Sequence, residues 1–92
     1  MSTSNHRERT TLTITQAAEH LISELRPAER EQLRTSTLPA FAYHRGLGMY
    51  IRNKYIYSRR FKIDTESEPA LWHPDSLSNA VVGEVLQLLR GE

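Results

Sequence analysis

The chain has 92 residues, which is enough for one domain with a single hydrophobic core and too few for two. Its formal net charge is +1 and no long uncharged apolar run occurs, so the sequence predicts a soluble protein without a membrane span. The absence of cysteine excludes disulfides and thiolate metal ligands, and residues 1–13 lack the apolar segment of a secretion signal, so we expect a cytoplasmic location.

The first predicted elements are a tail and a helix. Residues 1–12 are polar and charged without periodicity, which predicts a flexible tail. Over residues 13–25 apolar side chains recur at helical spacing. Thr13 followed by Gln16 three residues later is the signature of a capping box at the start of this helix, and Thr15 is an alternative cap.

Two further helices are predicted between residues 27 and 55. The second covers residues 27–34, because its first residue is a proline, which suits the first turn of a helix. It is mostly charged, so we expect it on the surface. Residues 41–55 predict a third helix that contains Gly46 and Gly48. Each glycine costs on the order of 1 kcal/mol inside a helix relative to alanine, so the pair implies either a helix start near Leu47 or close backbone packing.

The faces of the third helix separate apolar from polar side chains. Leu47, Ile51 and Tyr55 form the predicted inward stripe, whereas Arg52 and Asn53 fall on other faces.

The chain that follows is expected to be irregular. Residues 60–64 alternate polar and apolar side chains, which permits a short extended piece that is too brief to predict a sheet. Residues 65–74 are acidic and contain two prolines, so they predict a surface loop pinned by Leu71 and Trp72.

The last helix has the clearest signal. Asp75 is a suitable N-cap, apolar residues repeat along one face as far as Arg90, and Gly91 is a stop signal. The wide apolar face predicts that this helix is the centre of the core and packs against the first and third helices. The fold class is therefore predicted to be all-α, a small single domain of three to four helices over residues 13–92 with a flexible N-terminal tail.

Two motifs resemble the pattern of a known family. They are GLGMYIRN at residues 46–53, preceded by His44, and HPDSLS at residues 73–78. They resemble a small uncharacterised bacterial domain family, in which a His-x-Gly-Leu-Gly-x-x-Ile-Arg-Asn core precedes a His-Pro-Asp-x-x-Ser helix start. The matching residues are His44, Gly46, Leu47, Gly48, Ile51, Arg52, Asn53, His73, Pro74, Asp75 and Ser78. Arg45, where an aromatic residue is usual, and residues 54–58, which lack the familiar Leu-Trp, depart from it. The resemblance implies a mainly helical domain of bacterial or phage type and supplies no activity.

Catalytic and metal chemistry have weak signals. No nucleophile motif such as G-x-S-x-G occurs. His44 and His73 can converge with Asp75 as general bases, but the favoured interpretation is that both imidazoles cap or brace loops. His20 and Glu24 are the only possible metal ligands at i, i+4 spacing on one predicted helix, and two ligands do not make a site. We therefore expect no enzymatic activity, metal or cofactor.

Arg52 and Asn53 have two interpretations. An arginine fork beside an asparagine amide can read a carboxylate, a phosphate or a base edge. Alternatively, Arg52 bridges to Asp75 and joins the two motifs by an internal ion pair, and this structural interpretation is favoured.

Binding is the favoured function class. The segment from Phe41 to Lys62 contains six basic residues, no acidic residue and six of the seven aromatic residues, whereas residues 63–92 sum to about −5. Such a segment suits an acidic protein partner, a nucleic acid, or a solvated turn. The leading hypothesis is a small non-catalytic bacterial or phage protein-binding module of antitoxin, immunity or regulatory type. The alternative is nucleic-acid binding through residues 52–62. The predicted binding residues are His44, Arg52, Asn53, Tyr55, Tyr57, Arg59, Arg60 and Lys62.

Overall fold

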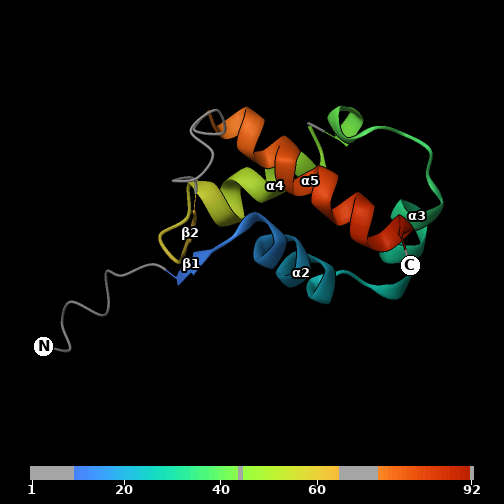
Figure 1. Ribbon diagram of the computed structural model, residues 1–92, viewed down its shortest axis with the longest axis horizontal. Coiled ribbons are helices and arrows are strands. Elements are labelled where there is room, and N and C mark those ends of the chain that lie inside the picture. Colours follow the sequence, from blue (N-terminus) through green and yellow to red (C-terminus); the bar gives the residue numbers. More distant parts are fainter. Residues whose placement is uncertain (1–9, 44, 65–72, 92) are drawn as a thin grey trace, which may run out of the picture.

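The computed structural model describes residues 10–43, 45–64 and 73–91 (Figure 1). Four α-helices contain most of the described residues: α2 (Ile14–Glu24), α3 (Pro27–Thr35), α4 (Leu47–Ile51) and α5 (Pro74–Arg90). A 3-10 turn (Ala40–Tyr43) precedes α4 and a π-helical segment (Arg52–Ile56) follows it. Two short strands, β1 (Thr10–Leu12) and β2 (Phe61–Ile63), complete the described elements. The fold is mostly helical, as expected, but it includes a small sheet that the all-α prediction omitted.

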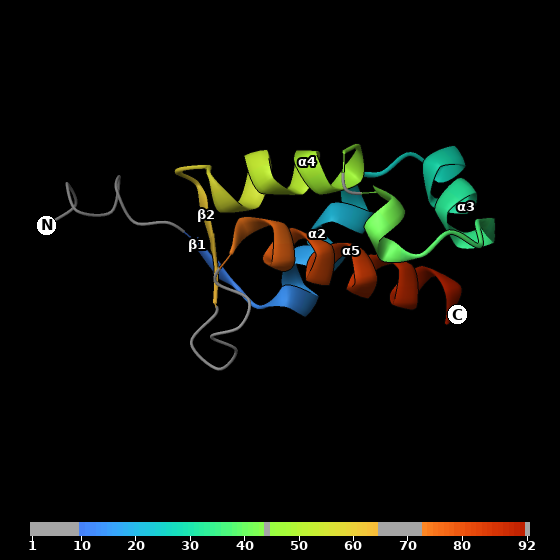
Figure 2. The same ribbon diagram turned by 90° about the horizontal axis from the view of Figure 1, so that it is seen from above.

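The hydrophobic core is centred on α5, which packs against both α2 and α4 (Figures 1 and 2). Val81 and Val85 of α5 are fully buried, as are Ala17 and Ala18 of α2 and Ile51 of α4. Burying one valine side chain stabilises a fold by roughly 1.5–3 kcal/mol. The prediction that the last helix packs against the first and third predicted helices is confirmed.

The helix ends follow the sequence signals with one exception. The backbone amide of Gln16 donates to the Thr13 side-chain Oγ1 at 3.0 Å, and the backbone amide of Thr13 donates to the Gln16 side-chain Oε1 at 2.9 Å. These two hydrogen bonds confirm the capping box. Gly91 ends α5, as predicted. The prediction that Asp75 is the N-cap of α5 is wrong, because His73 takes that position and its Nδ1 accepts the Asp75 amide at 3.2 Å. Proline occupies the first helical position between them, where its missing amide hydrogen has no cost.

The predicted third helix is broken into three pieces. The 3-10 turn ends at Tyr43, α4 begins at Leu47, and the helix widens at Arg52, whose carbonyl oxygen accepts the Tyr57 amide five residues later at 2.8 Å. The two explanations offered for the glycines both hold. The helix starts near Leu47, and Gly48 is buried against the backbone of the 3-10 turn.

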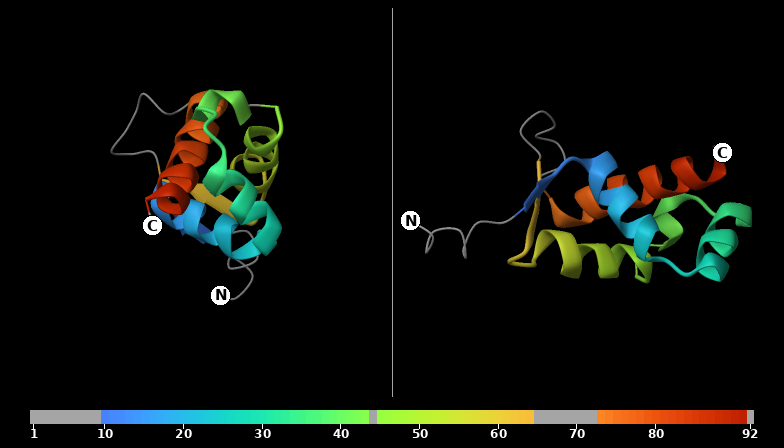
Figure 3. Two further views of the ribbon diagram at one scale, coloured as in Figure 1. Left: turned by 90° about the vertical axis from the view of Figure 1, so that its right-hand side faces the viewer. Right: turned by 90° about the horizontal axis from the view of Figure 1, so that it is seen from below.

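A two-stranded parallel sheet closes one end of the molecule, opposite α3 (Figure 3). In its register Thr10 pairs with Phe61 and Leu12 with Ile63. The Thr10 amide donates to the Arg60 carbonyl oxygen at 2.9 Å. Residues 10–12 were predicted as part of a flexible tail, and this part of the prediction is wrong because backbone hydrogen bonds hold them. The remainder of that tail, residues 65–72 of the predicted loop and His44 lie outside the described residues. The loop was predicted to extend to Pro74, but α5 already begins at that residue.

Two glycines inside helices are expected to respond differently to alanine. A Cβ on Gly83 of α5 would meet Ala40 Cβ at an ordinary contact distance of 4.0 Å. We expect Gly83→Ala to raise the free energy of unfolding by about 0.5–1 kcal/mol, because alanine is the better helix former. A Cβ on Gly48 would lie 3.2 Å from the Tyr43 carbonyl oxygen and 3.4 Å from Arg52 Nη1, so Gly48→Ala should lose that gain. Urea unfolding measures both changes, and equal gains would contradict close packing at Gly48.

Candidate functional site

Arg52 joins the two sequence motifs inside the molecule. Its side chain comes from the π-helical segment, and the residue is only 8% exposed. Its Nη1 donates to Ser78 Oγ on α5 at 3.0 Å and lies 3.6 Å from Asp75 Oδ1. The Ser78 hydroxyl donates in turn to the Asp75 carbonyl oxygen at 3.1 Å. This geometry is the internal ion pair that the structural interpretation of Arg52 expected, with Ser78 as an additional partner.

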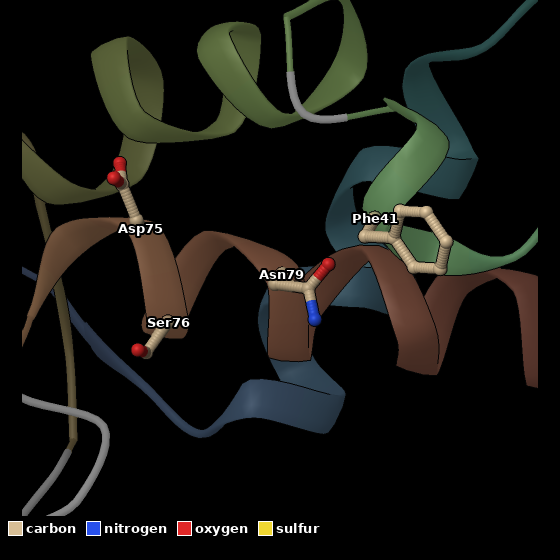
Figure 4. Close-up of a pocket in the computed structure, with 4 residues that line it drawn as sticks. All are labelled: Phe41, Asp75, Ser76 and Asn79. Carbon is tan, nitrogen blue, oxygen red and sulfur yellow. The ribbon is translucent and has the colours of Figure 1, made fainter.

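An open hollow lies on the outside of this junction (Figure 4). It has a volume of about 460 Å³ and is lined by Phe41, Asp75, Ser76 and Asn79. The Asp75 carboxylate points from α5 toward the helix that contains α4 (Figure 4), and Phe41 is 72% exposed. The lining therefore offers one carboxylate that is already paired, one hydroxyl, one amide and one aromatic ring. Among the described residues, the Ser76 hydroxyl has no hydrogen bond to a histidine or carboxylate that could act as its general base.

The two histidines of the motifs do not form a described catalytic pair. His73 uses Nδ1 to accept the Asp75 amide, so its imidazole caps α5, which is the structural role considered from the sequence. His44 is outside the described residues, so its position relative to His73 is left as a sequence hypothesis.

A ring cluster surrounds Tyr55. This residue is fully buried, and its hydroxyl lies 2.6 Å from His20 Nδ1. The centroids of the His20 and Phe61 rings are 5.6 Å and 5.2 Å from that of Tyr55. Burial raises the pKa of Tyr55 well above its ordinary value, because the charged phenolate would lose hydration. The contact between His20 and Tyr55 was not predicted from the sequence, because it forms only when two segments that are distant in sequence pack together.

The basic segment separates into neutralised and unpaired cations. Arg52 pairs with Asp75, and Lys54 Nζ lies 2.6 Å from Glu24 Oε1 on α2. By contrast, no carboxylate in the described part of the chain lies within ion-pair distance of Arg59, Arg60 or Lys62, all of which are exposed.

An exposed tyrosine accompanies these unpaired cations. Tyr57 is 62% exposed and directly follows the π-helical segment. We name the surface formed by Tyr57, Arg59, Arg60 and Lys62 the cationic end. It lies at the end of the molecule closed by β1 and β2 (Figures 1 and 3).

A protein-family model matches most of the chain. The model, described as a domain of unknown function (DUF6794), matches residues 12–89, which is most of the chain and includes both motifs. The chain belongs to the DUF6794 family. This agrees with the expectation of an uncharacterised family. No curated protein and no solved structure matches the DUF6794 chain.

Two further observations concern the described part of the DUF6794 domain. None of its helices has the length and apolar character needed to cross a membrane. Within the same residues, no three side chains of His, Cys, Asp or Glu gather where they could hold a metal ion. The candidate ligands His20 and Glu24 each have another partner, Tyr55 and Lys54 respectively.

The structure divides the predicted binding residues of the DUF6794 domain. Arg52 and Tyr55 are buried, and each reaches a partner on another helix, so neither side chain lies on the exposed surface; their binding role stays a prediction. Asn53 is exposed. The remaining described residues are those of the cationic end, which is therefore the largest group of predicted binding residues that the fold leaves accessible.

The ion pair between Glu24 and Lys54 predicts a pH dependence of stability. The hydrogen bond from Lys54 holds the pKa of Glu24 below its ordinary value of 4.5. A lowered pKa in the folded state gives stability that is present above pH 4.5 and is lost as the pH falls through the folded-state pKa. Both side chains are about a third exposed, so we expect Glu24→Gln to cost at most about 1 kcal/mol at neutral pH. This cost should shrink toward zero once the pH falls below the folded-state pKa of Glu24.

Urea unfolding at neutral and acidic pH tests this dependence. The control is Glu19→Gln, because Glu19 is exposed on the same helix and has no ion pair among the described residues. A cost of Glu24→Gln that is equal at both pH values would show that the carboxylate charge is not involved.

Proposed function

We propose that the chain is a small non-catalytic module that binds another protein through the cationic end. The observation that supports this proposal most directly is the contrast between the basic residues. Arg52 and Lys54 are neutralised by carboxylates of the same chain, whereas Arg59, Arg60 and Lys62 are exposed without such partners among the described residues. Unpaired arginines beside an accessible tyrosine are typical of protein contact surfaces.

The chemistry of the cationic end defines the partner class. Arginine binds carboxylates through paired hydrogen bonds, and tyrosine adds a large contact area with little loss of side-chain entropy. The guanidinium of Arg60 lies 5.7 Å from the centroid of the Phe61 ring, which helps to hold it in place. We therefore propose a partner that presents carboxylates around an apolar or aromatic contact. We propose an antitoxin, immunity or regulatory type of module, because the chain is small and has no catalytic motif.

Nucleic acid is the second candidate, favoured by the same exposed cations. Binding to nucleic acid usually combines many phosphate contacts with several rings that stack on successive bases. Here Tyr55 is buried and Phe61 belongs to the ring cluster, which leaves Tyr57 as the accessible ring of the segment from Tyr55 to Lys62. Protein binding is the better supported of the two functions for this reason.

The proposal predicts that paired arginine substitutions abolish partner capture. We expect Arg59→Ala combined with Arg60→Ala to reduce recovery of the partner by at least about tenfold, because both unpaired guanidinium groups are removed. The measurement is affinity purification of the tagged chain from its native host cells, followed by quantitative mass spectrometry. The matched control is Arg30→Ala combined with Arg34→Ala, which removes the same charge from exposed positions on α3 at the other end of the molecule.

The outcomes separate the two candidate functions. A stoichiometric protein retained by the control and lost from the Arg59/Arg60 variant would support the proposal. Equal loss from both variants would indicate that only net charge matters, which contradicts a specific surface. Binding of short oligonucleotides at about 50 mM salt, with a salt slope that falls by about one unit per lost phosphate contact, would establish nucleic-acid binding instead.

A further inference from the structure

A second surface lies away from the cationic end, at the start of α4. It is a groove of about 390 Å³ where the end of α2, the first turn of α3 and the first turns of α4 meet. The lining residues are Leu21, Glu24, Leu25, Glu29, Gly46, Leu47 and Tyr50. Figure 2 shows β2 beyond one end of the α4 helix and α3 beyond the other, so the start of α4, where the groove lies, is at the other end of that helix from the cationic end. Glu24, at one side of the groove, still interacts electrostatically with Arg60.

The inside of the groove is apolar. Leu21 is buried, Leu25 and Leu47 are half-buried, and Tyr50 is 46% exposed. An exposed tyrosine beside three leucines leaves apolar area in contact with water, and a partner that covers it gains free energy in proportion to the area covered. A volume of about 390 Å³ is near the lower end of known ligand sites, so it suits one or two side chains of a partner.

The rim of the groove is acidic. Its lining includes two acidic residues, Glu24 and Glu29. Lys54 already neutralises Glu24 and its Nζ lies 5.7 Å from the centroid of the Tyr50 ring, so Glu29 is the lining residue whose negative charge is not paired within the described part of the chain. Each carboxylate uses one oxygen inside the molecule: Glu24 Oε1 pairs with Lys54 Nζ at 2.6 Å, and Glu29 Oε1 accepts the Arg26 amide at 2.8 Å. Within the described part of the chain, Glu29 Oε2 has no hydrogen bond, so this carboxylate keeps an acceptor for a partner's cation.

We propose that this groove binds a segment of a protein partner in which an apolar side chain lies next to lysine or arginine. The apolar side chain would fill the space between Leu25, Leu47 and Tyr50, and the cation would reach Glu29 at the rim. This inference goes beyond the proposed function, because the groove selects a basic and apolar segment whereas the cationic end selects an acidic one. Opposite charge at two separate surfaces prevents one partner segment from satisfying both.

Selection from a display library of random peptides tests the proposal before any natural partner is identified. We expect the full chain to enrich peptides in which a leucine or aromatic residue is flanked by lysine or arginine. In Tyr50→Ala the affinity of these peptides should fall about tenfold, because an apolar wall is lost. In Glu29→Gln it should fall severalfold, because the charge is lost while glutamine still accepts the Arg26 amide and preserves the start of α3.

The controls distinguish the groove from general effects. Glu19→Gln changes an exposed carboxylate of α2 that does not line the groove, and it should leave peptide affinity unchanged. Thermal unfolding of each variant checks that the fold persists. The proposal is overturned if no peptide is enriched, if the enriched peptides lack a cation, or if Glu19→Gln and Glu29→Gln weaken binding equally. Self-association of the chain that Tyr50→Ala abolishes would also overturn it, because the groove would then bind a second copy.

Loss of partner capture by the Arg59/Arg60 variant does not bear on the groove. Failure of the peptide selection likewise leaves the cationic end unaffected, because the variants of each surface change different residues. The two proposals therefore succeed or fail separately.

Discussion

Replacing Tyr55 with alanine is expected to lower the free energy of unfolding by about 3–5 kcal/mol. The side chain is fully buried, contacts the rings of His20 and Phe61, and leaves a cavity when it is truncated. The matched control is Tyr57→Ala, two residues later, where the side chain is 62% exposed and the expected change is within about 0.5 kcal/mol. Urea unfolding of both variants measures the difference, and similar costs for the two tyrosines would contradict the burial of Tyr55.

A conservative substitution separates the hydroxyl from the ring. Tyr55→Phe keeps the ring and removes the hydrogen bond to His20, so we expect a loss of about 1 kcal/mol near neutral pH. Because burial raises the pKa of Tyr55 in the folded state, its contribution is present below its ordinary pKa of 10.0 and declines as the pH rises above that value. The free energy of unfolding of the unsubstituted chain relative to Tyr55→Phe should therefore fall in alkaline solution. A difference between the two that does not change with pH would contradict this explanation.

Arg52 is the second residue whose loss should be severe. Arg52→Ala is expected to lower the free energy of unfolding by about 2–3 kcal/mol, because it removes a buried aliphatic stem and the charged hydrogen bond to Ser78. Arg52→Lys should be intermediate, since an ammonium group cannot reproduce the geometry of the guanidinium fork. Chemical denaturation is again the measurement.

The neighbouring asparagine supplies the control for Arg52. Asn53 is exposed in the same π-helical segment, so Asn53→Ala should change stability by no more than about 0.5 kcal/mol. If Arg52→Ala were as mild as Asn53→Ala, the guanidinium would not be part of the structural junction, and a direct binding role for Arg52 would have to be considered again.

Local signals in the sequence predicted the helices well. The capping box of Thr13 and Gln16, the proline that opens α3 and the glycine that ends α5 each act within one turn of helix, and all three are found where they were expected. The apolar face of α5 also predicted the centre of the core. Helical periodicity also placed Tyr55 on an inward stripe, and its side chain is buried. The composition of the basic, tyrosine-rich segment selected the same residue for binding, and composition does not distinguish buried from exposed tyrosines.

Features that depend on distant contacts were missed. The strands have three residues each and are parallel, so neither length nor a hairpin turn could indicate that Thr10 pairs with Phe61. The sequence suggested the pairing of Arg52 with Asp75 but not its hydrogen bond to Ser78, which comes close only after α5 has packed against α4. No sequence propensity marks the change from α-helix to π-helix at Arg52. The cationic end could be predicted because its residues are adjacent in sequence, whereas the groove could not because three separate helices form it.

The pairing of β1 with β2 bears on where the chain tolerates attachments. Since the Thr10 amide bonds to the Arg60 carbonyl oxygen, any fusion or linker introduced ahead of Thr10 enters the fold directly beside that arginine. The opposite terminus leaves the fold after Gly91, at the far end of the long axis (Figure 1). Affinity tags and immobilisation chemistry are therefore best placed after α5, where they do not obstruct the strand that bears Lys62.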